Sequence, residues 1–128
     1  MRRALAWGAV GAYAALVFVL SSKADPLPLL TQNVWDKAIH FLEYGTLGVL
    51  LAVALWTSGL PLRRAGVLAA VLASLYGASD EFHQSFVPGR EADPRDWLAD
   101  TLGGASGAVA AAVALRVRAP RASIRRSR

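Results

Sequence analysis

Four apolar stretches divide the chain, and their lengths suit membrane-spanning helices. They predict spans at about residues 4–20, 38–60, 65–83 and 95–115. An α-helix rises 1.5 Å per residue, so about 20 apolar residues cross the ~30 Å hydrocarbon layer. The third stretch is short, and it crosses only if its polar end, from Asp80 to His83, reaches the interface. The stretches are rich in Ala and Leu and do not alternate with period two, which argues against strands.

Charged residues sort into two groups when four crossings are assumed. Turn formers separate the stretches at 25–28, 58–61 and 88–89. One side receives ten arginines and no acidic residue: Arg2, Arg3, Arg63, Arg64, Arg116, Arg118, Arg121, Arg125, Arg126 and Arg128. The other side receives all nine acidic residues, together with Lys23, Lys37, Arg90 and Arg95. The positive-inside rule therefore predicts that both termini are cytoplasmic. Residues 116–128 then form a basic cytoplasmic tail that faces anionic headgroups.

Composition narrows the class of protein further. The chain has 128 residues, which predicts a single domain over 1–128. Apolar types make up 55% and charged types 18%, too few polar residues to cover a soluble protein of this size. The apolar content also excludes intrinsic disorder. The chain has no cysteine, which excludes disulfides, a Cys-ligated zinc site and a thiol nucleophile. The net charge of +5 does not indicate nucleic-acid binding, because the arginines flank membrane spans.

We therefore predict an all-α, multi-pass four-helix bundle in the cell membrane, with the lipid bilayer as its main partner. An alternative concerns the first span. An Arg pair, an apolar run and Ser22-Lys23-Ala24 are also compatible with a cleaved signal peptide. Cleavage would leave three spans and place the new N-terminus outside, so we expect the first span to be retained.

Ionisable residues gather in three short segments, all at the outward ends of spans. The segments are Asp36, Lys37, His40, Glu43 and Tyr44, then Asp80, Glu81, His83 and Gln84, then Asp93, Asp96 and Asp100. Helical residues three or four apart share a face, so each segment forms a polar stripe. Ionisable groups at membrane depth usually face a bundle interior or a wet cavity. The three stripes are thus predicted to share one outward-facing pocket.

Some of these residues also have a purely structural interpretation. Asp93 before Pro94, with Asp96 in the first turn, fits the start of a helix. Asp80 and Glu81 lie near a helix C-terminus, where the macrodipole disfavours negative charge. They need a cationic partner, and a structural ion-pair cluster would supply one as well as a metal would. Asp100 lies two turns into its helix and also needs a partner.

Three glycines on the fourth span have two interpretations. Gly103, Gly104 and Gly107 form a face of small residues, which allows close helix packing. We expect this packing within the chain, with a homodimer as the alternative.

The polar segments also resemble the VanZ-like membrane protein family over roughly residues 13–115. The similar motifs are Asp36-Lys37-x-x-His40-Phe41-x-x-Tyr44, Asp80-Glu81-Phe82-His83-Gln84-x-Phe86-Val87-Pro88-Gly89-Arg90, and Asp96 followed by Thr101-Leu102-Gly103-Gly104. The resemblance implies an association with low-level teicoplanin resistance and supplies no mechanism. The chain departs from the family pattern at Asp100, where Asn is usual, and at Asp93, where Ser is common.

Two main functions compete for this pocket. The first is an enzyme acting at the outer leaflet on a lipid-linked or cell-envelope substrate. Its catalytic candidates are His40 and His83 as acid or base, Asp36 and Asp80 to orient them, and Glu81. The binding candidates are Lys37, Tyr44, Gln84, Arg90, Asp96 and Asp100. A divalent metal such as zinc, manganese or magnesium is an open alternative, with His40, His83, Asp80 and Glu81 as candidate ligands.

The second function is a binding module that captures an envelope precursor, a lipid headgroup or the glycopeptide without chemistry. A small ion-coupled transporter is a third alternative. No charge is predicted inside the cytoplasmic half of the spans, where a continuous relay would need one. The variety of side chains in the pocket favours the enzyme.

Overall fold

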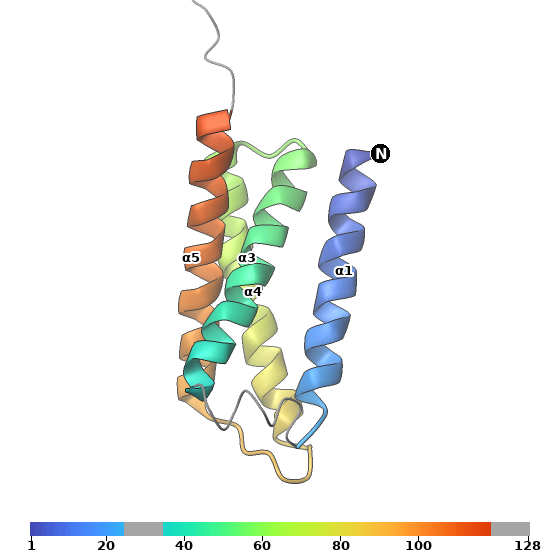
Figure 1. Cartoon of the computed structure of the whole chain (residues 1–128), viewed down its shortest axis with the longest axis vertical. Coiled ribbons are helices and arrows are strands. Elements are labelled where there is room, and N and C mark those ends of the chain that lie inside the picture. Colours follow the sequence, from blue (N-terminus) through green and yellow to red (C-terminus); the bar gives the residue numbers. More distant parts are fainter. Residues whose placement is uncertain (25–34, 119–128) are drawn as a thin grey trace, which may run out of the picture.

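The computed structural model describes residues 1–24 and 35–118, and in this part of the chain it contains four α-helices. They are α1 (Arg2–Ser21), α3 (Asp36–Thr57), α4 (Leu62–Gln84) and α5 (Pro94–Arg118). The helices run alternately up and down, and the N-terminus and the end of α5 lie at the same end of the bundle (Figure 1). The predicted all-α four-helix bundle is confirmed. The predicted turn at 25–28 and the tail beyond Arg118 lie outside the described residues.

The helix bounds follow the predicted spans, with one clear difference. The second span was predicted to reach residue 60, but α3 ends at Thr57. Gly59 takes the left-handed conformation, with φ of 98°. Its N–H donates to Trp56 O at 2.9 Å, and Leu60 N–H donates to Leu55 O at 3.2 Å. These two bonds satisfy free carbonyls at the helix end in the manner of a Schellman motif, so the helix stops there.

Glycines bring α3 and α5 into backbone contact. A Cβ placed on Gly48 would overlap the carbonyl oxygen of Gly104. One placed on Gly103 would overlap that of Phe41, and one placed on Gly107 that of Gly45. Close approach through small residues is a common way for membrane helices to associate, because lipid offers no hydrophobic driving force. The small-residue face predicted on the last helix thus packs inside this chain.

Small side chains also line the contact of α4 with its neighbours. Ala65, Ala69 and Ala73 are fully buried. The hydroxyls of Ser74 on α4 and Thr101 on α5 lie 2.8 Å apart.

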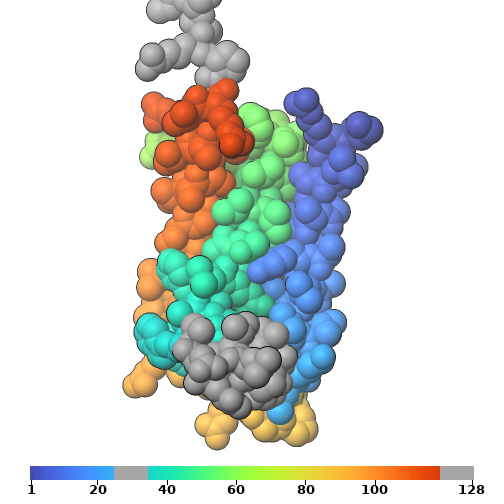
Figure 2. Space-filling model, in the orientation of Figure 1, coloured from blue at the N-terminus to red at the C-terminus, as the bar shows by residue number. Residues whose placement is uncertain are grey.

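Helix α1 lies at the edge of the bundle against α3 and α4 (Figure 1). Its side chains meet those of α3 along the face shown in Figure 2. Three hydrogen bonds fasten it. Tyr13 Oη donates to Glu43 O at 3.1 Å, Tyr76 Oη donates to Ala14 O at 2.7 Å, and Trp7 Nε1 donates to Ser58 Oγ at 2.9 Å.

Three helices in the described ranges are long and apolar enough to cross a membrane: α1, α3 and α5. Helix α4 forms as predicted but is not among them. Its uncharged segment runs only from 65 to 79, between an arginine pair and an acidic pair. These three candidate spans indicate a multi-pass membrane protein. Large side chains of α1 such as Leu5 and Phe18 are exposed, as expected for a helix that faces lipid.

Candidate functional site

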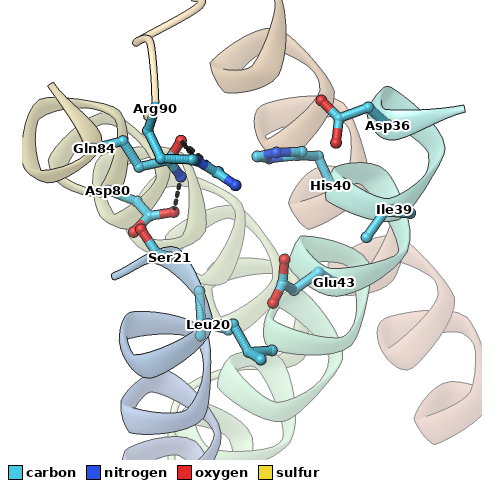
Figure 3. A pocket seen from close by; sticks show the side chains of 10 residues that line it. Leu20, Ser21, Asp36, Ile39, His40, Glu43, Asp80, Gln84 and Arg90 are labelled. Carbon is cyan, nitrogen blue, oxygen red and sulfur yellow. Dashed lines mark hydrogen bonds between the residues drawn. The ribbon is translucent and has the colours of Figure 1, made fainter. Parts of the chain in front are cut away.

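A small cavity lies at the end of the bundle where the acidic residues gather. It has a volume of about 40 Å³ and lies between α1, α3, α4 and the segment that follows α4 (Figure 3). Its walls are formed by Val17, Leu20, Ser21, Asp36, Ile39, His40, Glu43, Asp80, Gln84 and Arg90. A water molecule needs roughly 10–15 Å³ of such space. The cavity therefore has room for a few water molecules or for one small group of a larger ligand.

His40 and Asp100 form a buried hydrogen-bonded pair at one wall. The His40 Nδ1 atom lies 2.9 Å from Asp100 Oδ1. His40 is 6% exposed and Asp100 is fully buried. Asp100 is held from behind by α4, because a Cβ on Gly77 would lie 2.9 Å from Asp100 Oδ2. The partner that Asp100 was predicted to need is thus an imidazole, and the carboxylate fixes the orientation of that ring.

Asp80, Gln84 and Arg90 form a second chain of hydrogen bonds across the cavity. Gln84 Nε2 donates to Asp80 Oδ2 at 3.1 Å. Arg90 donates to Gln84 Oε1 through Nη2 at 2.6 Å and through Nε at 3.3 Å. In Figure 3 the Arg90 guanidinium and the His40 imidazole point toward each other from opposite sides. In the described ranges Arg90 forms no ion pair with a carboxylate.

Lys37 joins the start of α3 to the start of α5. Its ammonium forms ion pairs with Asp96, with Asp93 at 2.9 Å and with Asp36 at 3.7 Å. Asp93 also caps α5, because its Oδ1 accepts a hydrogen bond from the Arg95 N–H at 2.8 Å. That backbone bond, with the Lys37 ammonium beside it, lowers the pKa of the Asp93 carboxyl. The predicted helix start is confirmed, and Asp93 and Asp96 also anchor Lys37.

Glu81 completes the polar interior. Its Oε2 accepts a hydrogen bond from the Asp93 N–H at 2.9 Å, which ties α4 to the loop before α5. Its other oxygen, Oε1, is buried without a hydrogen-bond partner among the described residues, as is Asp100 Oδ2. The same holds for the hydroxyls of Ser21 and Tyr44. Tyr44, a predicted binding residue, lies beneath the polar layer and is not among the side chains that line the cavity.

His83, the second predicted catalytic histidine, lies elsewhere. Its Nε2 is 3.0 Å from Ser22 Oγ, and its ring packs on Phe18 with centroids 4.6 Å apart. It contacts the end of α1 and does not line the cavity. The structure therefore does not bring the two histidines together.

Two polar residues that line the cavity were not among the catalytic and binding candidates from the sequence. Glu43 lies three residues after His40 on α3, and this spacing placed it in the predicted polar stripe without a role. Ser21 comes from the end of α1, where a lone serine after an apolar run gives no such signal.

Two groups of side chains have the geometry to hold a metal ion. Ligand atoms of His40, Glu81 and Asp100 lie within 4.8 Å of one another, and all three residues are buried. Asp36, His40 and Asp96 form the other group. Of the four metal ligands predicted from the sequence, His40 and Glu81 share a group, and His83 and Asp80 belong to neither.

The oriented imidazole of His40 faces the guanidinium of Arg90 across a small polar cavity. A carboxylate bonded to one nitrogen of an imidazole fixes its tautomer, which is what a general acid or base requires. An arginine without a carboxylate partner can bind an anion by two parallel hydrogen bonds. The cavity can therefore hold an anionic group beside a proton-transferring group.

Comparison with models of known protein families identifies the family of this chain. Residues 7–115 match the VanZ/LLP1 family model, so the chain belongs to this family. No curated protein and no solved structure matches it significantly.

Proposed function

We propose that this VanZ/LLP1 protein is a membrane enzyme that acts on an anionic, lipid-linked or cell-envelope substrate at the envelope side of the membrane. His40 is the acid–base group, Asp100 orients it, and Arg90 binds the anionic group of the substrate. The observation that carries the proposal is the buried His40–Asp100 hydrogen bond of 2.9 Å at the cavity wall.

The surroundings of the pair support a role in proton transfer. A histidine that only fills space needs no fully buried carboxylate behind it, and burying that carboxylate is costly. Asp100 is kept there although its second oxygen has no partner. Costly arrangements of ionisable groups concentrate at functional sites.

Arg90 supports the anionic nature of the substrate. A guanidinium carries five N–H donors, and Arg90 uses two of them on Gln84. Its remaining donors bond no other described residue and can bind a phosphate or carboxylate beside His40. Because the cavity is small, only the charged group of the substrate enters it, while the lipid part stays in the bilayer.

The proposed side of the membrane follows from the two ends of the bundle. Arg2, Arg3, Arg63, Arg64, Arg116 and Arg118 lie at the end opposite the cavity. The positive-inside rule supports placing that end in the cytoplasm, with all four helices crossing. The cavity then opens toward the cell envelope, where glycopeptides act.

Antibiotic susceptibility tests the proposal, because the proposed function includes a link to teicoplanin resistance. A sensitive host carrying the wild-type chain is compared with hosts carrying His40→Gln or Glu91→Gln at matched membrane abundance. Glu91 is exposed in the loop after α4, so its variant is the charge-loss control. We expect the wild type and Glu91→Gln to protect against teicoplanin and His40→Gln to fail. Full protection by His40→Gln would contradict an acid–base role.

A second candidate function is capture of the anionic ligand without chemistry. The observation that favours it is the free hydrogen-bonding capacity of Arg90, which suits binding alone. Under this alternative, Arg90→Gln abolishes protection and His40→Gln keeps most of it. A transporter has less support, because the buried charged side chains of the described ranges all lie at the cavity end.

A further inference from the structure

The carboxylates of the site outnumber the cations that contact them. Four acidic side chains are buried: Asp80, Glu81, Asp96 and Asp100. Lys37 pairs with Asp96, and His40 is bonded to Asp100. In the part of the chain that the structure describes, neither Asp80 nor Glu81 forms an ion pair. Buried carboxylates without a countercharge are strongly disfavoured, so each carboxyl of this layer either holds a proton or is balanced by further positive charge.

Two of the residues with an unpartnered oxygen, Glu81 and Asp100, belong to one small group of buried side chains. Glu81 is 8% exposed and Asp100 is 0% exposed, and each has one carboxylate oxygen without a hydrogen-bond donor. Asp100 packs on Gly77 of α4, and Glu81 lies four residues later on the same face of that helix. The side chain from α5 and the side chain from α4 therefore approach each other.

The spacing of this group suits a cation. Ligand atoms of Glu81, Asp100 and His40 lie within 4.8 Å of one another. Around a small divalent cation at ~2.1 Å, neighbouring and opposite ligands lie about 3 to 4 Å apart. The separations in this group therefore differ by at most about 2 Å from those around such an ion.

We propose that Glu81 and Asp100, two buried carboxylates that each keep one unpartnered oxygen among the described residues, bind a divalent cation of the Mg²⁺ or Mn²⁺ class. Hard cations of this class prefer carboxylate oxygens, and Mg²⁺ is commonly held by one or two carboxylates, waters and a substrate phosphate. His40 stays bonded to the other oxygen of Asp100 and keeps the carboxylate oriented.

The inference rests on the proposed function only for the role of the ion. When bound, the cation would balance the acidic layer and offer an open position to the anionic group of the substrate. The binding of the ion itself is argued from Glu81 and Asp100 alone, so it can be tested without any substrate.

Mn²⁺ binding to the purified full-length chain tests the site. The protein is stripped with a chelator and titrated with Mn²⁺, and bound and free Mn²⁺ are followed by electron paramagnetic resonance. We expect about one saturable Mn²⁺ per chain and a loss of affinity of at least ~10-fold in Glu81→Gln and in Asp100→Asn. Glu91→Gln, an exposed acid on the loop between α4 and α5, is the control and should bind as the wild type.

The melting temperature gives a second measurement. It compares the wild type with Glu81→Gln, both without metal and with added Mn²⁺. Without metal, Glu81→Gln should melt at a higher temperature than the wild type, because it removes a buried uncompensated charge. Added Mn²⁺ should raise the melting temperature of the wild type, leave that of Glu81→Gln unchanged and so reverse their order.

Two results would overturn the inference: no saturable Mn²⁺ binding by the wild type, or unchanged affinity in Glu81→Gln. The proposed function fails by a different result. Mn²⁺ binding with full protection by His40→Gln would retain the ion and reject the acid–base role. If the wild type binds no Mn²⁺ and His40→Gln loses protection, the cation site is rejected and the acid–base role of His40 is retained.

Discussion

Replacing Gly103 by alanine is expected to push α5 away from α3 at the level of the His40–Asp100 pair. A Cβ at this position would lie 2.8 Å from the Phe41 carbonyl carbon and 2.9 Å from its Cα, and nearer still to its oxygen. Non-bonded carbons normally lie about 3.5–4.0 Å apart. All of the opposing atoms belong to the backbone, so no side-chain rotation relieves the overlap. The helices must separate by roughly 0.7 Å or more.

This displacement acts on both stability and the site. Asp100 lies one turn before Gly103, and His40 is next to Phe41. A separation of ~0.7 Å would lengthen the 2.9 Å contact between His40 and Asp100 to about 3.6 Å, where a hydrogen bond is lost. Overpacking costs about 1–3 kcal/mol, and a side-chain hydrogen bond inside a membrane protein contributes roughly 0.6 kcal/mol on average. The overpacking dominates, and the free energy of unfolding should fall by about 2–4 kcal/mol.

Gly66→Ala is the matched control on α4. Its Cβ would meet Ala112 Cβ at 3.8 Å and Ala108 O at 3.9 Å, which are ordinary contacts. Unfolding in mixed micelles by increasing the fraction of SDS, followed by tryptophan fluorescence, measures both variants. Gly66→Ala should stay within ~1 kcal/mol of the wild type. Equal stability of the two variants would refute the backbone contact between α3 and α5, and retention of protection by Gly103→Ala would refute its link to the site.

Two further predictions concern topology and the start of α5. With cysteines at Arg64→Cys and Glu91→Cys, at the two ends of α4, a membrane-impermeant thiol reagent applied to intact cells should label only the second. Labelling of both would show that α4 does not cross the membrane. Asp93→Ala should destabilise the fold at neutral pH, because it removes both the cap of α5 and one of the three carboxylate partners of Lys37. The Asp93 pKa is lowered by folding, so the wild-type advantage is full above 3.8 and declines as the pH falls below it. A difference in melting temperature that is independent of pH between 6 and 2.5 would contradict this linkage.

The fold and its helix starts were largely predictable because their signals are local. Apolar length indicated the helices, and Asp93 before Pro94 indicated the start of α5, since a cap needs only adjacent residues. The end of α3 was placed three residues late, because apolar Leu60 continues the pattern after Gly59 has already reversed the backbone. In this case backbone conformation took precedence over hydropathy.

The residues that line the cavity were less predictable, because they depend on which face of each helix points into the bundle. Successive residues on a helix are rotated by roughly 100°. Asp80, Glu81 and Gln84 therefore span one sector, and all three are buried. His83 lies about 100° from Gln84, on the side toward α1. The spacing of three residues predicted that His83 and Asp80 share a helix face that points into the pocket. In the structure, the His83 side chain instead contacts the end of α1.

The pairing of His40 with Asp100 could not be read from spacing at all. Sixty positions separate the two residues, and the backbone contact between α3 and α5 brings them together. The sequence identified Asp100 as a group in need of a partner, but it proposed Asp36 or Asp80, not Asp100, to orient His40. Only the packing of the glycines shows which partner each one has.

The unequal polarity of the four helices bears on how the chain enters a membrane during synthesis. Helices α1, α3 and α5 are apolar enough to insert independently as they leave the ribosome. Helix α4 carries Asp80, Glu81 and Gln84, which are buried only when α3 and α5 are beside it. Under the proposed topology with four crossings, stable insertion of α4 therefore depends on α5, which is synthesised after it. The polar cavity would then assemble in the same step in which α4 becomes stably inserted.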